Sequence, residues 1–321
     1  MRFSNTLVMA AAASTASAQR PSDTPICDYY TTALLEDNTA DNQATLLTLL
    51  VNTVVIGNYT MPNVGVMVPG ILAKGQYNGT DVNLLPYFDG ELASSNRGGD
   101  EGVAINFLDD GGAEPLMKNM PSNGKNSMQY FLLTHLYQFF GSLLGCTQQG
   151  MPGFDAYTGF PSMYEVHKFM DLDAAEFGYF VQQVGLAAAS FGVADADVTA
   201  VGMALNSLFG YKCAPPTTAI KAQGPQLQSI CIAEDCPVAE NSVCDKYEPA
   251  MEPKSATSTY SMMPTMTSSY PGSSSMAATM MPNGTATMTG SMSPTMIPTA
   301  GAVANGMNIA AVAGGIAAFL L

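Results

Sequence analysis

The sequence predicts an all-α fold for residues 26–212. Several segments of this stretch carry apolar residues at helical spacing, and the alternation that marks a β-strand is scarce. Capping residues stand at the starts of the later segments, where the first amide groups of a helix need acceptors. The expected helices are residues 43–56, 126–145, 161–170, 173–191 and 195–209.

Apolar stripes identify the first two helices. The residues of the first helix that share one face are Leu46, Leu49, Leu50 and Val54. The stripe of the second helix contains Met128, Leu132, Leu136 and Phe139, with Leu143 one turn further on. Each stripe predicts a helix that packs one face against a core.

Start and stop signals identify the later helices. Pro161 and Ser162 suit the start of a helix. Asp173 precedes Glu176 by three residues, which is the spacing of a capping box. Gly192 follows at a position that suits the end of that helix.

The segments between the helices are expected to be irregular and exposed. The Gly-, Asp- and Asn-rich stretch 84–125 predicts a loop with one short helix. Glycosylation sequons, which predict surface positions, begin at Asn58, Asn78 and Asn283. The first two bracket residues 58–80, which we interpret as an exposed insertion.

The two ends of the chain predict export and a lipid anchor. Residues 1–18 have a positive start, an apolar run and the small-x-small site Ala16-Ser17-Ala18, as in a secretory signal peptide. Residues 302–321 end in an apolar run shorter than the about 20 residues of a membrane span, and small residues precede it. This arrangement favours a GPI-attachment signal, with a tail-anchored or membrane-spanning protein as the alternative.

The protein is therefore expected outside the cell, GPI-anchored to the plasma membrane or cell wall, with the membrane as a partner through the lipid. Residues 251–301 are rich in Ser, Thr, Pro and Met and nearly uncharged, which is typical of an O-glycosylated stalk. Their methionines are soft ligands for Cu(I), but irregular spacing and the lack of His or Cys favour a plain stalk. The net charge of −15 disfavours a nucleic-acid partner.

The cysteines predict disulfides. The chain has six Cys, an even number that suits an exported protein. Four of them fall in residues 213–250, which we interpret as a disulfide-stapled appendage outside the main core. Cys27 and Cys146 are expected to pair elsewhere, and the spacing leaves the individual pairings open.

The two histidines are the residues best suited to bind a metal or a cofactor. His135 and His167 both lie on apolar helices, where a histidine is more often structural than a ligand. An apolar pocket with one or two imidazoles suits haem, whereas zinc takes three or four ligands. Neither a GxSxG motif nor a Ser-His-Asp or Cys-His set is legible, so a hydrolase has no support.

Four stretches of the chain together resemble a known family. They are LLPYFDG (84–90), FFGSLLGC (139–146), AYTGFPSMYEVHKFMDL (156–172) and EFGYFVQQVGLAAASFGVADADV (176–198). Their order and spacing resemble the truncated haemoglobins of the first group. The resemblance covers roughly 43–57 and 81–210, with insertions, and implies an all-α, globin-like, truncated 2-over-2 helical fold.

The resemblance also implies a haem b cofactor and a set of haem-binding residues. His167 corresponds to the proximal ligand of the haem iron, with Met163 and Val166 on the proximal side. Leu132 and Leu136 correspond to the distal wall. His135 corresponds to a position near the haem propionates, or it acts as a second axial ligand.

On the distal side the sequence departs from the pattern of the family. Val54 and Val55 stand where the family usually has a Tyr, and Leu136 stands where it has a Gln. Bound dioxygen would therefore have no hydrogen-bond donor except His135.

The sequence thus favours a binding protein for haem, with O2 or NO as gas ligands, in haem or iron handling or in gas binding. No catalytic residue is assigned. The alternatives are a haem-free structural or adhesive surface protein and an enzyme, either a haem peroxidase or a nitric-oxide dioxygenase.

Overall fold

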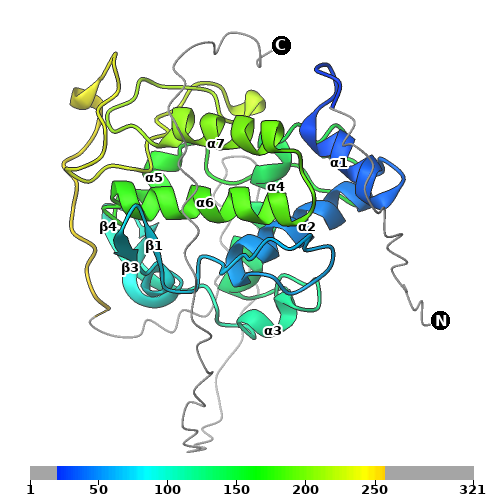
Figure 1. Cartoon of the computed structure of the whole chain (residues 1–321). Helices are drawn as coiled ribbons and strands as arrows, with labels where there is room; N and C mark the ends of the chain where they lie inside the picture. Colours follow the sequence, from blue (N-terminus) through cyan, green and yellow to red (C-terminus); the bar gives the residue numbers. More distant parts are fainter. Residues whose placement is uncertain (1–19, 257–321) are drawn as a thin grey trace, which may run out of the picture. The chain divides into compact units, whose positions relative to one another are not determined.

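The computed structural model describes residues 20–256, and Figure 1 shows how their helices and strands are arranged. The predicted signal peptide (1–18) and anchor signal (302–321) lie outside the described residues. So does the predicted stalk, except for its first six positions, 251–256. Within the described part, no helix is both long and apolar enough to cross a membrane.

Seven α-helices form the main part of the described chain, and every helix predicted from the sequence is present. Their bounds are α1 (Ile26–Leu35), α2 (Ala40–Ile56), α3 (Ala113–Leu116), α4 (Met128–Leu143), α5 (Met163–His167), α6 (Ala174–Ser190) and α7 (Asp195–Phe209). The predicted capping box is confirmed: the Asp173 side chain accepts from Glu176 N, and the Glu176 side chain accepts from Asp173 N. Ser162 caps α5 in a similar way, by accepting from Glu165 N.

The predicted all-α fold class is wrong, because the described chain is mixed α/β. About 39% of its residues are helical and about 12% are in strands. The strands are β1 (Gly75–Tyr77), β2 (Thr80–Val82), β3 (Asp89–Gly98) and β4 (Glu101–Asn106). They form two separate antiparallel pairs, β1 with β2 and β3 with β4.

The β1–β2 hairpin occupies the segment predicted as an exposed insertion. Its turn is Asn78-Gly79, and both residues have positive φ angles, 50° and 85°. A two-residue turn with this geometry favours Asn-Gly, since Gly has no Cβ and Asn tolerates the left-handed region. Asn78 is exposed at the tip, so the sequon there is accessible.

The β3–β4 ribbon replaces much of the loop predicted for residues 84–125. Only Ala93 and Ser95 are buried on β3, so the ribbon lacks the apolar alternation that reveals a strand. The end of the described chain adds to its edge. Ala93 N donates to Lys254 O, and Ala256 N donates to Glu91 O, each at 2.8 Å.

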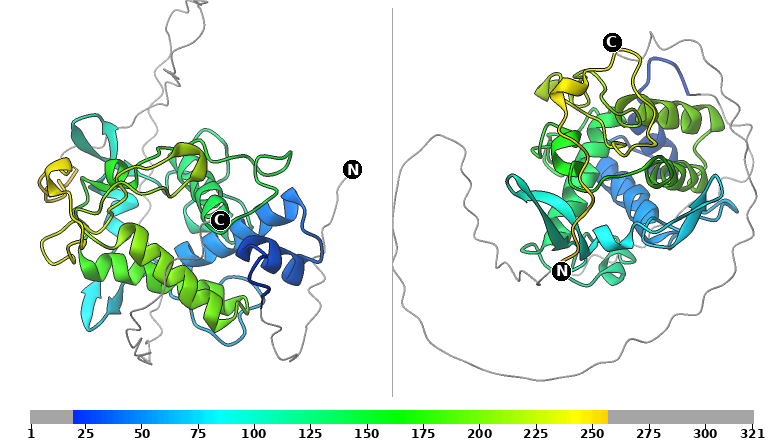
Figure 2. Two further views of the ribbon diagram at one scale, coloured as in Figure 1. Left: turned by 90° about the horizontal axis from the view of Figure 1, so that it is seen from above. Right: turned by 90° about the vertical axis from the view of Figure 1, so that its left-hand side faces the viewer.

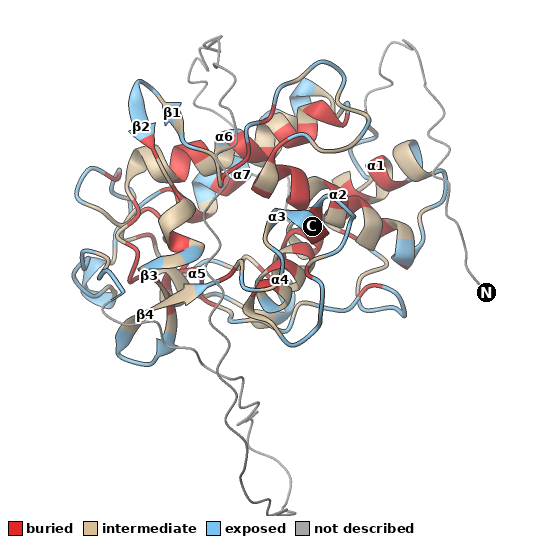
Figure 3. Ribbon diagram, turned by 90° about the horizontal axis from the view of Figure 1, so that it is seen from below, coloured by how far each residue is buried: buried red, intermediate tan, exposed pale blue. Residues whose placement is uncertain are grey.

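The core lies where α2, α4 and α6 meet, and Figure 3 shows their inward faces as buried. Helix α6 packs beside α7 and against α2, as the ribbons of Figures 1 and 2 show. Tyr179 on α6 is almost fully buried, and its hydroxyl donates to Gly70 O and Ala73 O at 3.2 Å. Helix α6 therefore fixes the segment that leads into β1.

All six cysteines form disulfides, as predicted. The pairs are Cys27–Cys146, Cys213–Cys244 and Cys231–Cys236. Residues 213–250 are not the separate appendage outside the main core that the sequence suggested. Cys231 and Cys236 belong to the hydrophobic core, and Cys231 N donates to Phe209 O at 3.1 Å, so this segment packs directly on α7.

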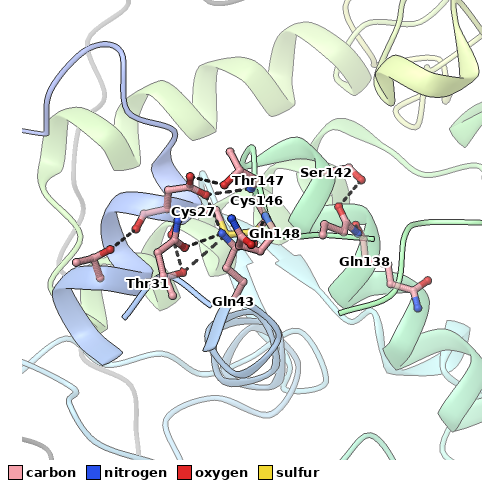
Figure 4. Close-up of a disulfide and its surroundings, with 12 residues drawn as sticks. Cys27, Thr31, Gln43, Gln138, Ser142, Cys146, Thr147 and Gln148 are labelled. Atoms are coloured by element: carbon pink, nitrogen blue, oxygen red, sulfur yellow. Dashed lines mark hydrogen bonds between the residues drawn. A yellow bond between two sulfur atoms is a disulfide. The ribbon is translucent and has the colours of Figure 1, made fainter. Parts of the chain in front are cut away.

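The Cys27–Cys146 disulfide joins α1 to the turn after α4 and lies within a polar network, shown in Figure 4. Asp28 accepts from Thr147 N at 3.0 Å and from Gln43 Nε2 at 2.8 Å. Gln43, which is fully buried on α2, accepts in turn from Gln148 N at 3.0 Å. One covalent bond and its neighbours thus hold α1, α2 and the end of α4 together.

We expect the Cys27→Ala/Cys146→Ala double variant to lose about 5 kcal/mol of unfolding free energy from loop entropy, because this disulfide closes a separation of 119 residues. Cys231→Ala/Cys236→Ala is the matched control. Its two cysteines are buried, as are those of the first pair, but they are only 5 residues apart. Its expected loss is about 2 kcal/mol. Urea unfolding measures both losses of unfolding free energy. Equal losses would contradict the conclusion that the long-range disulfide is the main constraint.

Candidate functional site

Helix α5 has only five residues, and the segment around 227–228 holds it in place. Ser162 Oγ donates to Leu227 O at 2.6 Å. Gln228, which is almost fully buried, accepts from Met163 N at 3.0 Å. A helix this short has little stability of its own, so these tertiary bonds fix its position.

His167 is the last residue of α5, and its ring is oriented by the helix itself. Its Nδ1 lies 2.7 Å from Met163 O. A carbonyl oxygen only accepts, so Nδ1 carries the proton and Nε2 has the free lone pair. Within residues 20–256 no hydrogen bond engages Nε2, and the side chain is half-buried. Burial lowers the pKa of His167, which favours the neutral ring that binds a metal.

Lys168 ties the end of α5 to the last part of the described chain. Its Nζ lies 2.9 Å from Glu248 Oε1 and 3.1 Å from Glu165 Oε2. Glu248 N also donates to Tyr164 Oη at 2.8 Å. The segment around Glu248 therefore clamps the helix that carries His167.

Helix α4 carries the other predicted site residues, and a buried polar pair sets its rotation. Tyr137 Oη donates to Asn52 Oδ1 at 2.6 Å, and Asn52 Nδ2 donates to Leu116 O at 3.1 Å. The most buried stripe of α4 contains Leu133, Tyr137 and Phe140. Leu132 and Leu136 of the predicted stripe lie beside it and are half-buried, whereas Phe139 of that stripe is buried.

An apolar recess lies between α2, α4 and α6. Its lining includes Val54, Val55, Leu136, Phe140 and Phe180, and its cavity volume is only about 10 Å³. No polar side chain lines it. This volume is far below the about 300–1,000 Å³ of small-molecule pockets, and His167 lies outside the recess.

His135 lies on the outer side of the α4 stripe, among aromatic rings. Its Nδ1 is 2.6 Å from Phe131 O, so Nδ1 donates and Nε2 is left free to accept. Its ring centroid is 4.1 Å from that of Phe131 and 6.0 Å from that of Tyr157. Burial and, less strongly, the charge of Arg97 lower the pKa of His135.

The structure places the six predicted site residues on two separate helices. Leu132, His135 and Leu136 are on α4, whereas Met163, Val166 and His167 are on α5. The two helices lie apart in Figures 1 and 3 and share no extensive contact. Leu132, Leu136 and Val166 pack against the same hydrophobic core, and Met163 is buried within it.

Two neighbouring residues of the site were not predicted from the sequence. Arg97 on β3 lies over the Phe131 ring, with 4.4 Å between the guanidinium carbon and the ring centroid. Tyr157, in the loop before α5, contacts Phe139 with a centroid distance of 5.2 Å. Arg97 is one of only three arginines in the chain, which is the signal that could have drawn attention to it.

A site for a bare metal ion has no support in the described part of the chain, where no group of three or more His, Cys, Asp or Glu side chains is placed to hold one. His167 is instead a single oriented imidazole beside apolar side chains, and the apolar recess does not include it. Comparison of the chain with family models, curated proteins and solved structures gave no match.

The start of α6 carries a carboxyl group with an altered pKa. Burial raises the pKa of Glu176 to about 7, and the charge of Asp173 adds to this effect. Tyr87 Oη lies 3.4 Å from Glu176 Oε1. Because the folded-state pKa is above the unfolded value of 4.5, the folded protein binds more protons between these two values. The contribution of Glu176 to stability is therefore fully present below pH 4.5 and is lost as the pH rises through about 7.

We expect Glu176→Gln to remove this part of the pH dependence of the unfolding free energy, since Gln keeps the capping box and does not ionise. Relative to the variant, the wild type should lose roughly 1–2 kcal/mol of unfolding free energy between pH 4.5 and 7.5, after discounting for solvent screening. Urea unfolding at a series of pH values measures the difference. If the unfolding free energies of the wild type and the variant change with pH in the same way, the raised pKa of Glu176 is contradicted.

Proposed function

We propose that the described domain binds haem b and that His167 Nε2 is an axial ligand of the iron. The observation that carries the proposal is the 2.7 Å contact between His167 Nδ1 and Met163 O. A histidine that binds a metal through one nitrogen usually donates from the other to a carbonyl or carboxylate. This contact fixes the tautomer and raises the basicity of Nε2.

The walls of the proposed site come from the two helices. Met163 and Val166 would contact the haem on the side of His167, and Leu132 and Leu136 on the opposite side. Met163 is buried and the other three are half-buried. Such apolar surface would suit the faces of a macrocycle and would exclude water from the iron. Bound haem would supply gas-ligand binding and one-electron chemistry. His135 is the candidate for a hydrogen bond to a gas ligand or for a second axial bond.

We further propose a distant relation to the truncated haemoglobins that is limited to the helical segments. The resembling stretches fall mainly on α4, α5, α6 and α7. Strand β1 and most of the β3–β4 pair lie in the segments taken as insertions, so the relation does not extend to the fold class.

The proposed setting is the cell surface, with a GPI anchor behind a stalk. Three disulfides are compatible with an extracellular location. An exported haem-binding domain is better suited to haem or iron handling than to oxygen storage, with O2 or NO binding as a related role. A peroxidase or nitric-oxide dioxygenase would depend on His135 as its polar distal group.

One observation favours a second candidate, a haem-free structural or adhesive protein. The apolar recess has a volume of only about 10 Å³ and does not include His167. Haem binding at His167 would therefore require space that this recess does not provide.

A haemin titration followed by absorbance separates the two candidates. We expect the wild-type domain to bind haemin, and His167→Ala to bind it roughly 100-fold more weakly or worse, because loss of a ligand exceeds loss of its supporting bond. His167→Gly with added imidazole should recover the absorption band. Haemin binding by His167→Ala with unchanged affinity and spectrum would contradict the proposal.

His135→Ala tests the distal role in the same titration. If His135 is a second axial ligand, the variant should change from a six-coordinate to a five-coordinate spectrum. If His135 only lies near the edge of the haem, the spectrum of the variant should be the same as that of the wild type.

A further inference from the structure

We propose that Asn58 carries an N-linked glycan, and that this glycan covers an apolar patch formed by residues 61–67 and 117–120. The inference rests on the cell-surface setting of the proposed function, because N-linked oligosaccharides are attached to exported proteins. It does not depend on haem binding.

The apolar patch consists of large side chains that are exposed on two short segments. These segments hold five of the twelve exposed large apolar residues found in residues 20–256, namely Met61, Val64, Met67, Met117 and Met120. Met67 has 75% of its surface exposed and Met61 has 62%. Single exposed apolar residues are normal, whereas a group of them indicates a surface that another molecular group covers.

Two hydrogen bonds hold the segments of the patch near one another. Tyr59 Oη donates to Asn119 Oδ1 at 2.9 Å, which joins the loop after α2 to the residues that follow α3. Helix α3 is itself bound to α2, because Asn52 Nδ2 donates to Leu116 O at 3.1 Å. The exposed side chains of the two segments therefore belong to one part of the surface.

The Asn58 side chain lies at the base of the loop, and the atom that accepts a glycan is free. Its Oδ1 accepts from Val68 N at 2.6 Å, and its backbone N donates to Val68 O at 3.0 Å. Asn58 is exposed, and no hydrogen bond within residues 20–256 uses its Nδ2. Because Val68 directly follows Met67, a sugar on Nδ2 begins beside the most exposed member of the patch.

Attachment of a glycan is compatible with this geometry. Asn58 Nδ2 displaces a lipid diphosphate from the anomeric carbon of the donor oligosaccharide: the C–N bond forms, the C–O bond to the phosphate breaks, and one amide proton is lost. Oδ1 remains a carbonyl oxygen, so its hydrogen bond with Val68 N is kept. The motif Asn58-Tyr59-Thr60 has the required Thr and no Pro in the middle. The C–H faces of the first sugars would cover the apolar side chains, while the sugar hydroxyl groups face water.

Asn78 provides a matched control, because its sequon has the same chemistry without an apolar patch. It lies at the exposed tip of the β1–β2 hairpin, where a Cβ at Gly79 would meet nothing within 4 Å. None of the exposed large apolar residues of the described chain lies in either strand of this hairpin. Loss of a glycan from Asn78 would therefore leave the exposed apolar surface unchanged.

The test uses the protein exported from a eukaryotic host and two variants, Thr60→Ala and Thr80→Ala. Each variant removes one sequon but keeps its Asn, so the hydrogen bond of Asn58 and the turn at Asn78 remain. We expect peptide mass spectrometry to find a glycan on Asn58 in the wild type and to find none there in Thr60→Ala.

Fluorescence of the dye ANS, which binds exposed apolar surface, measures the covering of the patch. It should rise severalfold in Thr60→Ala and stay at the wild-type level in Thr80→Ala. Adding Met61→Gln and Met67→Gln to Thr60→Ala should reverse the rise. If Thr60→Ala does not fold, enzymatic removal of N-linked glycans from folded Thr80→Ala should give the same rise, because Asn58 then has the one sequon left in residues 20–256.

The possible outcomes separate this inference from the proposed function. An unmodified Asn58 in the exported protein overturns the inference, and so does equal dye fluorescence with and without the glycan on Asn58. Equal rises in Thr60→Ala and Thr80→Ala would reflect a general loss of glycan and would also overturn it. A chain that is not exported overturns both the inference and the proposed cell-surface setting. A wild type that has the glycan on Asn58 but does not bind haemin overturns the proposed function and keeps the inference.

Discussion

The disulfide between Cys27 and Cys146 is the constraint on which the rest of the structure depends. It links the first helix to the turn after α4, and the Asp28–Gln43 network extends the link to α2. These three helices form one side of the core. Because α4 is held at its end by this bond and along its length by Tyr137 and Asn52, its Leu132 and Leu136 stripe has a fixed direction. The position of the proposed distal wall thus depends on the Cys27–Cys146 disulfide.

The helices could be predicted from the sequence because their signals are local. Apolar spacing identifies α2 and α4, and the Asp173–Glu176 capping box identifies the start of α6. The strands could not be predicted in the same way. The β3–β4 ribbon is polar on most of its surface, so no alternation marks it, and its pairing with residues 254–256 joins distant parts of the chain. The Asn78-Gly79 turn was a readable hairpin signal that the all-α expectation overlooked.

The site could be predicted only in part for the same physical reason. His167 is identified by its sequence neighbours, and its Nδ1 contact follows from helical geometry, since Met163 is one turn earlier. The clamp from Lys168 to Glu248 and the approach of Arg97 to Phe131 depend on tertiary packing. No local pattern encodes such contacts. The residues that surround the two histidines were therefore less visible in the sequence than the histidines themselves.

The most direct measurement of the central claim is a crystal structure of the described domain with haemin bound. The account predicts that the iron bonds to His167 Nε2, that Nδ1 keeps its contact with Met163 O, and that the macrocycle lies between α4 and α5. A haem on the outer surface of the domain, or one whose iron is bound by His135 without His167, would contradict it.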